Sequence, residues 1–149
     1  MIRELKQDDN LIPLLSEWKS ECQGDLLAIE CDPEVTQQHL KMVKNSQGVV
    51  FVLDDSGIVG IIGVQLIQSP IGRNLMGNEH LWYVEKNHRG IGSVRLFSKA
   101  MKWAAENGCT HFMATASMLA SELHDTVCDL YKIMGMQKFE TTYIGRLGG

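Results

Sequence analysis

Apolar positions along the chain change their spacing between strand-like and helix-like segments. Residues 48–53 and 58–68 are runs of β-branched and apolar side chains, and the Asp-Asp-Ser-Gly turn between them predicts a β-hairpin. Between residues 90 and 107 the apolar positions recur every three or four residues, which indicates an amphipathic helix. Asn107-Gly108 is a typical end for such a helix.

Capping and turn residues mark the other elements. Asp32-Pro33 places a capping side chain before a proline at the first helical position, and so predicts a helix that runs to about residue 44. Asn10, with the aspartates before it, offers a cap for an earlier helix that ends at Gly24. Further predicted elements are a short strand at 2–5, strands at 75–85 and 110–115, a helix at 120–134 and one or two strands within 137–147.

The order of the predicted elements indicates the fold class. Strand, two helices, three strands, helix, strand, helix and final strands describe an α/β sandwich with a mixed sheet. The 149 residues contain no repeat and no Pro- or Ser-rich linker, and this length is typical of one domain. We therefore expect a single domain over residues 1–149.

Composition and charge argue against several classes of protein. Apolar residues make up 44% of the chain and charged residues 21%, an ordinary globular mixture. The net charge of −4 is unfavourable for binding nucleic acid through bulk charge. The first residues are charged, and no apolar run approaches the ~20 residues that would cross a bilayer. We therefore expect a soluble cytoplasmic protein with no membrane partner.

The chain has four cysteines: Cys22, Cys31, Cys109 and Cys128. They form no C-x-x-C pair and have no histidine at zinc-ligand spacing. We expect four reduced thiols and no metal site.

Glycines in a strand-to-helix turn carry the clearest chemical signal. Gly90 and Gly92 stand between a predicted strand and the long predicted helix, where N–H groups have no partner and the helix dipole places partial positive charge. Without side chains at these positions, a diphosphate could approach those N–H groups. Lys86 and Arg89 add positive charge, and the Ser93 hydroxyl is a further donor. The structural alternative is a tight turn that only packs the helix on the sheet. The Walker and dinucleotide-binding glycine patterns are absent.

Two motifs make the sequence similar to the GNAT superfamily of N-acetyltransferases. That family's phosphate-binding signature, (Q/R)-x-x-G-x-(G/A), aligns with Asn87-His88-Arg89-Gly90-Ile91-Gly92. Both glycines match, and Asn87 replaces the usual Gln or Arg. The family's Leu-Tyr-x-x-x-Gly-Phe motif aligns with residues 130–136, where Met136 replaces the phenylalanine. The resemblance covers almost the whole chain. It implies a mixed, mostly antiparallel sheet of six to seven strands with splayed strands 4 and 5, flanked by about four helices.

The resemblance also implies where acetyl-CoA would bind. Pantetheine would insert between the splayed strands and pair with the backbone of Trp82, Tyr83 and Val84. One N–H group in this region would stabilise the oxyanion of the tetrahedral intermediate. The pyrophosphate would lie on the turn, with Asn87, His88, Arg89, Gly90, Ile91, Gly92 and Ser93 as the implied contact residues.

Candidate catalytic residues follow from the same resemblance. Tyr131 would be the general acid that protonates the leaving thiolate, because the reference pKa of a phenol, about 10, is close to that of a thiol. Glu79 would be the base that takes a proton from the amine. Strand alternation puts His80 on the opposite face from Glu79, so only one of them should face the cleft. His111 and His124 are lesser candidates. The structural alternatives are a half-buried tyrosine and a solvated carboxylate.

We therefore expect an acetyl-CoA-dependent N-acetyltransferase that works by direct attack of an amine in a ternary complex. Two alternatives stay open: a non-catalytic GNAT-fold protein that binds acyl-CoA or a macromolecular partner, and an unrelated α/β domain. The sequence does not identify the acceptor amine, a small molecule or a protein, although the acidic net charge mildly favours a cationic one. The family often forms dimers, so a homodimer is compatible with the resemblance.

Overall fold

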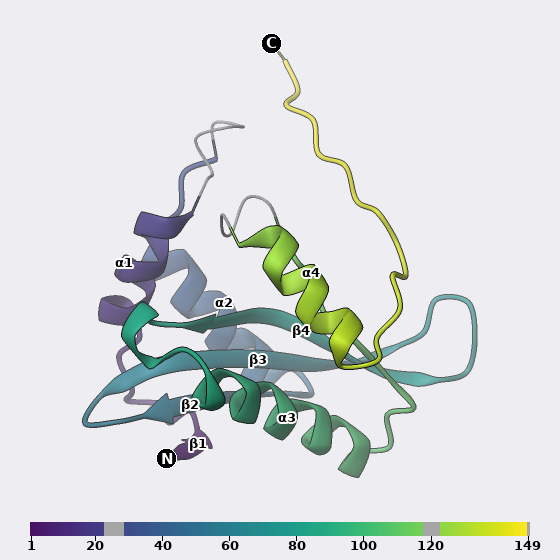
Figure 1. The fold of residues 1–149 in the computed structure, drawn as a ribbon, viewed down its shortest axis with the longest axis horizontal. Helices are drawn as coiled ribbons and strands as arrows, with labels where there is room; N and C mark the ends of the chain where they lie inside the picture. Colours follow the sequence, from purple (N-terminus) through teal and green to yellow (C-terminus); the bar gives the residue numbers. More distant parts are fainter. Residues whose placement is uncertain (23–28, 118–122, 149) are drawn as a thin grey trace. The chain divides into compact units, whose positions relative to one another are not determined.

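The computed structural model describes residues 1–22, 29–117 and 123–148, which belong to two compact units. The first unit comprises Met1–Lys19 and Asp32–Thr115, and the second comprises Ser20–Cys31 and Ala116–Gly149. The elements in chain order are β1 (Ile2–Glu4), α1 (Ile12–Glu21), α2 (Pro33–Asn45), β2 (Gly48–Asp54), β3 (Ile58–Gln68), β4 (Leu75–Val84), the 3₁₀ turn η2 (Lys86–His88), α3 (Ile91–Glu106), β5 (His111–Met113) and α4 (His124–Ile133) (Figure 1).

One mixed sheet forms the centre of the first unit. Its strands lie in the order β1-β2-β3-β4-β5. The pairs β1–β2, β2–β3 and β3–β4 are antiparallel, and β5 is parallel to β4. This confirms the mixed, mostly antiparallel sheet and the predicted hairpin. The described residues form five strands instead of six to seven, because residues 137–147, predicted to add one or two, form neither helix nor strand.

Helices α2 and α3 cover opposite faces of this sheet. A methyl group on Gly63 of β3 would touch Leu40 of α2, whereas one on Gly60 would approach Leu96 of α3. An odd separation along a strand places two positions on opposite faces. Four apolar residues of α3 are buried, as the helical stripe predicts. The face towards α2 holds a buried apolar cluster, which consists of Leu5, Leu11, Leu14, Leu15, Leu40, Val50, Val52, Ile61 and Tyr83.

Strand β5 accompanies β4 over only the first part of its length. β5 pairs only with residues Met76, Gly77 and Asn78 of β4, whereas β4 continues to Val84 and pairs with β3 along its other edge. Within the described ranges, no strand pairs with the outer edge of β4 beyond Asn78. This confirms the splay of strands 4 and 5 that the family resemblance implies.

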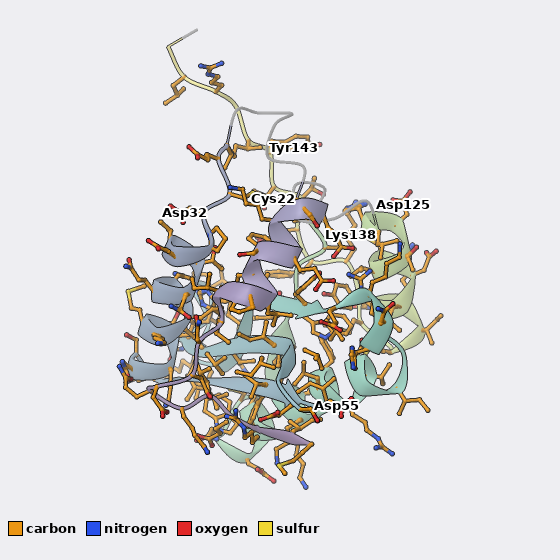
Figure 2. All side chains as sticks on the ribbon, turned by 90° about the vertical axis from the view of Figure 1, so that its left-hand side faces the viewer. Cys22, Asp32, Asp55, Asp125, Lys138 and Tyr143 are labelled. Atoms are coloured by element: carbon orange, nitrogen blue, oxygen red, sulfur yellow. A yellow bond between two sulfur atoms is a disulfide. The ribbon has the colours of Figure 1, made fainter. Side chains whose placement is uncertain are left out.

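The helix starts agree with the sequence where they can be compared. Asp32, labelled in Figure 2, caps α2 by accepting a hydrogen bond from the Glu34 N–H at 2.9 Å. Asn10 Oδ1 accepts from the Ile12 N–H at 3.1 Å at the start of α1. The predicted end of that helix at Gly24 lies outside the described residues. The helix predicted at 120–134 is described as α4 from His124, and residues 120–122 of the prediction lie outside the described part.

None of the described helices is long and apolar enough to span a membrane.

The structure corrects the expectation of four reduced thiols. Cys22, directly after α1, and Cys31, just before the α2 cap, are joined by a disulfide within the second unit (Figure 2). Cys109 and Cys128 are free thiols. The expectation was wrong because a disulfide depends on the distance between two residues in the folded chain, and a missing C-x-x-C motif says nothing about that distance.

Candidate active site

The glycine turn joins β4 to α3 as the sequence predicts. β4 ends at Val84, η2 follows, and Gly90 is the residue that caps the N-terminus of α3. Gly90 has φ of 115° and ψ of −126°, a conformation that residues with a Cβ rarely adopt. No heavy atom of its surroundings lies within 4 Å of the position that a Cβ would take. The turn is therefore open at this glycine.

The first turn of α3 presents unpaired N–H groups. No side chain caps the helix, and its first hydrogen bond joins the Val94 N–H to the Gly90 carbonyl at 3.2 Å. No described residue accepts a hydrogen bond from the N–H groups of Ile91, Gly92 and Ser93. Three free donors at the positive end of a helix dipole form a site suited to an anion.

Side chains hold this turn against the sheet. Arg89 Nε donates to the Val84 carbonyl at 2.8 Å, and the guanidinium carbon lies 5.5 Å from the centre of the Tyr83 ring. A Cβ on Gly92 would lie 3.0 Å from Leu53 Cδ2, so the start of α3 packs closely on β2. The Arg89 guanidinium therefore helps to hold the turn through these contacts.

His88 is the second side chain of the turn with specific partners. Its Nε2 lies 3.2 Å from Asp55 Oδ2, and its Nδ1 lies 2.6 Å from Glu85 Oε1. The shorter contact lacks the alignment of a hydrogen bond. Asn87, beside it, is exposed. The two partners of His88 come from the β2–β3 turn and from the end of β4.

The side chains at the end of β4 pack on the two faces of the sheet. The Trp82 ring packs on Phe97 of α3 with 4.7 Å between ring centres, and Tyr83 belongs to the buried cluster on the α2 side. Val84 is buried close to Gly60. An edge strand presents main-chain N–H and C=O groups whatever its side chains contact. A ligand beside the outer edge of β4 would therefore meet the backbone of these residues and not their side chains.

Glu79 is a buried carboxyl group on β4. Glu79 is only 8% exposed. Its Oε2 accepts a hydrogen bond from the Thr115 N–H at 3.2 Å. Burial raises the pKa of Glu79 to about 7, although the Thr115 hydrogen bond acts in the opposite direction. A carboxyl group with this pKa exchanges its proton near neutral pH, which suits a general base.

A β-bulge separates Glu79 from its neighbour His80. Gly63 of β3 lies opposite Leu81, and Val64 lies opposite Glu79, so His80 is the extra residue on β4. The bulge breaks the simple alternation of side chains that the sequence argument assumed.

His80 forms a link between β4 and α2. Its Nδ1 lies 2.9 Å from Nε2 of His39 on α2, and its Nε2 lies 3.0 Å from Gln65 Oε1. Gln65 Nε2 donates to the Ser46 carbonyl, so the amide oxygen of Gln65 faces His80. Burial and the neighbouring His39 lower the pKa of His80. Glu79 and His80 therefore contact different elements.

The other candidate residues have local partners. Tyr131 is the buried residue of α4 in the second unit. His111 of β5 is exposed, and its Nδ1 lies 2.8 Å from Thr110 Oγ1. His124 begins α4, where its Nδ1 lies 3.0 Å from Asp125 Oδ1. In the described ranges, no group of three or more His, Cys, Asp or Glu side chains is placed to hold a metal ion.

Sequence reasoning missed the partners that support the site from other segments. Thr115 bonds to Glu79, Asp55 faces His88, and His39 contacts His80. No local motif marks Thr115, Asp55 or His39, because each contact arises only when the sheet and its helices are assembled.

The arrangement of elements defines the class of protein. A sheet whose fourth and fifth strands diverge beside a glycine turn that opens a helix is the arrangement expected of an acyl-group transferase of the GNAT type. The chain belongs to the acetyltransferase (GNAT) family, whose family model matches residues 12–136. Among curated proteins, no sequence matches it.

Solved structures share the fold over the whole chain. A transcriptional regulator from Bacillus halodurans C-125 is similar with a TM-score of 0.77 and 17% identity, covering 99% of both chains. A ribosomal-protein-alanine N-acetyltransferase from Brucella melitensis biovar Abortus 2308 has a TM-score of 0.73 and 18% identity over 99% of both chains. An aminoglycoside acetyltransferase from an uncultured soil metagenomic sample has a TM-score of 0.70 and 14% identity, covering 99% of this chain and 98% of that chain. At these identities the likeness shows the fold alone.

Proposed function

We propose that this protein transfers the acetyl group of acetyl-CoA to an amine acceptor. The observation that carries the proposal is the start of α3, where Ile91, Gly92 and Ser93 have unpaired N–H groups next to the open position at Gly90. A helix start of this kind suits the diphosphate of coenzyme A. Membership of the acetyltransferase family supports an acetyl donor.

The outer edge of β4, which no described strand joins beyond Asn78, supports a place for pantetheine. Beyond Asn78, β4 is bonded to β3 on one side and to no described strand on the other. In our proposal, the backbone of Trp82, Tyr83 and Val84 pairs with the pantetheine amides. An N–H group of this edge points at the thioester carbonyl. One such preorganised donor can lower the barrier by roughly 3–4 kcal/mol.

Glu79 is the general base of the proposed reaction. The acceptor ammonium group gives one proton to the Glu79 carboxylate, directly or through water, and the resulting amine attacks the carbonyl carbon of the thioester. The C–N bond forms, and the oxyanion collapses as the C–S bond breaks to release a thiolate. The nitrogen loses its second proton to water, which leaves a neutral amide. The pKa of Glu79, about 7, places its deprotonated form within reach at neutral pH.

Tyr131 is the proposed general acid for the thiolate. The proposal rests on the Leu130-Tyr131 and Gly135 positions of the family motif. Tyr131→Phe should lower kcat and leave the affinity for acetyl-CoA unchanged. Equal kcat in the variant and the wild type would remove Tyr131 from the mechanism.

The direct test uses a panel of amines with acetyl-CoA, read out as release of free thiol, together with calorimetric titration of acetyl-CoA. We expect binding and turnover of at least one amine. Glu79→Gln should lower kcat by about 10²- to 10⁴-fold, the usual contribution of a general base, with unchanged coenzyme affinity. Binding without turnover would favour the alternative, a non-catalytic GNAT-fold protein. No binding at millimolar acetyl-CoA would overturn the proposal.

The acceptor and the cellular setting are further parts of the proposal. The net charge of −4 favours a cationic amine over a neutral one, so polyamines and lysine peptides should be acetylated faster than neutral amines in the panel. We also propose a cytoplasmic location and a single functional domain over residues 1–149. Sedimentation of the purified chain would test the homodimer that is common in the family.

A further inference from the structure

The His88 ring, at the end of η2, lies between two acidic side chains. Nε2 faces Asp55 Oδ2 at 3.2 Å, and Nδ1 faces Glu85 Oε1 at 2.6 Å. The His88 side chain is 31% exposed and that of Glu85 is 24% exposed, whereas Asp55 is 68% exposed. The ring therefore has a carboxylate oxygen close to each of its two nitrogens.

These contacts join three segments of the first unit. Asp55 belongs to the β2–β3 turn, labelled in Figure 2, which is itself closed by the Asp55 N–H donating to the Gly57 carbonyl. Glu85 follows β4, and its N–H donates to the Val59 carbonyl of β3. The His88 N–H donates to the Glu85 carbonyl. The ring thus ties η2 to two segments that the sheet already holds in place.

We propose that His88 is a positioning residue, which holds the glycine turn against the β2–β3 turn through Asp55 and Glu85 instead of contacting the coenzyme itself. The inference rests on the proposed acetyl-CoA function and deepens it. Gly90, two residues after His88, caps α3. The N–H groups proposed to bind the diphosphate follow it directly, at residues 91–93. A turn anchored in this way presents those groups in one arrangement, so less ordering is needed when the diphosphate binds.

Asp55 makes the proposal testable, because two explanations predict effects of opposite sign. If only Coulomb forces matter, removing the negative charge of Asp55 near a diphosphate strengthens coenzyme binding. If the Asp55–His88 contact holds the turn, the same substitution weakens binding. Asp55 is largely exposed, so its loss should leave the fold intact.

The experiment is a double-mutant cycle with Asp55→Ala, His88→Ala and the double variant, in which the affinity for coenzyme A is measured by calorimetry. We expect Asp55→Ala to weaken binding about two- to fivefold, the range for one partly exposed polar contact between side chains. The double variant should be no weaker than His88→Ala alone, because both changes break the same contact. Glu106→Ala, which removes a 63% exposed carboxylate at the other end of α3, is the matched control and should not weaken binding.

A second readout needs no ligand. Amide hydrogen exchange at residues 86–93 should be faster in Asp55→Ala than in the wild type and unchanged in Glu106→Ala. Tighter or unchanged coenzyme binding in Asp55→Ala, or additive losses in the double variant, would overturn the positioning role. Failure of the wild type to bind coenzyme A would instead contradict the proposed function, so the two failures are distinguishable.

Discussion

At the scale of single residues, Glu79 combines a catalytic proposal with a cost in stability. The folded-state pKa of about 7 lies above the ordinary value of 4.5, so the folded chain holds a proton that the unfolded chain releases. The contribution of Glu79 to the free energy of unfolding is therefore highest below pH 4.5, where its carboxyl group is protonated in both states. This contribution is lost as the pH rises to about 7, because the unfolded chain releases the proton over this range while the folded chain still holds it. Glu79→Gln, which keeps an acceptor for the Thr115 N–H, should therefore be more stable than the wild type at pH 8, by up to about 3 kcal/mol.

Urea unfolding at pH 5 and pH 8 measures this difference. The gain from Glu79→Gln should shrink towards zero at pH 5, where the wild-type carboxyl group is protonated in the folded state. Glu106→Gln, on an exposed residue, should show no such pH dependence. A gain of the same size at both pH values would mean that burial does not control the Glu79 proton.

The sequence predicted where the reactive groups stand along the chain, but it could not predict their surroundings. The pattern placed Glu79 on a strand and the resemblance gave it a role. Its raised pKa comes from burial, which the Thr115 hydrogen bond partly opposes, and both exist only in the folded sheet. His88 was expected among the coenzyme contacts. Its contact with Asp55 could not be foreseen, because Asp55 is distant in sequence.

At the scale of elements, the start of α3 assigns different roles to its two glycines. Gly90 has a positive φ with open space around its Cβ position, whereas Gly92 lacks a positive φ and its Cβ would meet the end of the Leu53 side chain at 3.0 Å. Gly90→Ala should destabilise the fold by about 1–3 kcal/mol through backbone strain. Gly92→Ala should change stability by less than about 1 kcal/mol, because Leu53 can shift and alanine favours the helix.

Chemical unfolding of the two variants compares the roles directly, and calorimetry with coenzyme A adds a second measurement. Gly90→Ala should also weaken coenzyme binding, since strain at this residue displaces the N–H groups of the helix start. Equal stability losses in both variants would show that steric contact, and not the φ angle, decides which glycine is needed.

Elements with local signals were predicted well, and features that depend on pairing were not. The Asp32 cap and the hairpin follow from neighbouring residues, and both are confirmed. The bulge at His80 is invisible in the sequence, because it is defined by which residues of β3 lie opposite Leu81 and Glu79. Strand propensity describes a residue that fits a pleated surface and contains no information about the partner strand.

At the scale of the whole molecule, the disulfide makes a simple prediction about thiol content. Cys22 and Cys31 are bonded, and Cys109 and Cys128 are free. Denatured, unreduced protein should therefore take up two iodoacetamide groups by mass spectrometry, and reduced protein four. Replacing both Cys22 and Cys31 by serine should lower the free energy of unfolding by about 2–3 kcal/mol, as expected for a short closed loop. Four groups without a reductant would contradict the bond.

The C-terminal segment is where sequence pattern and structure differ most. Residues 137–147 contain the β-favouring run Thr141-Thr142-Tyr143-Ile144, yet they form no strand, and Tyr143 is 90% exposed. A strand gains its hydrogen bonds only from a neighbour, so without one its amides exchange freely with solvent. We expect hydrogen exchange at 137–147 to be complete within the shortest labelling time, while the centres of β2 and β3, paired on both edges, stay protected. Strong protection at 137–147 in the isolated chain at low concentration would restore the predicted strands. Protection that appears only as the concentration rises would assign the missing neighbour to a second copy.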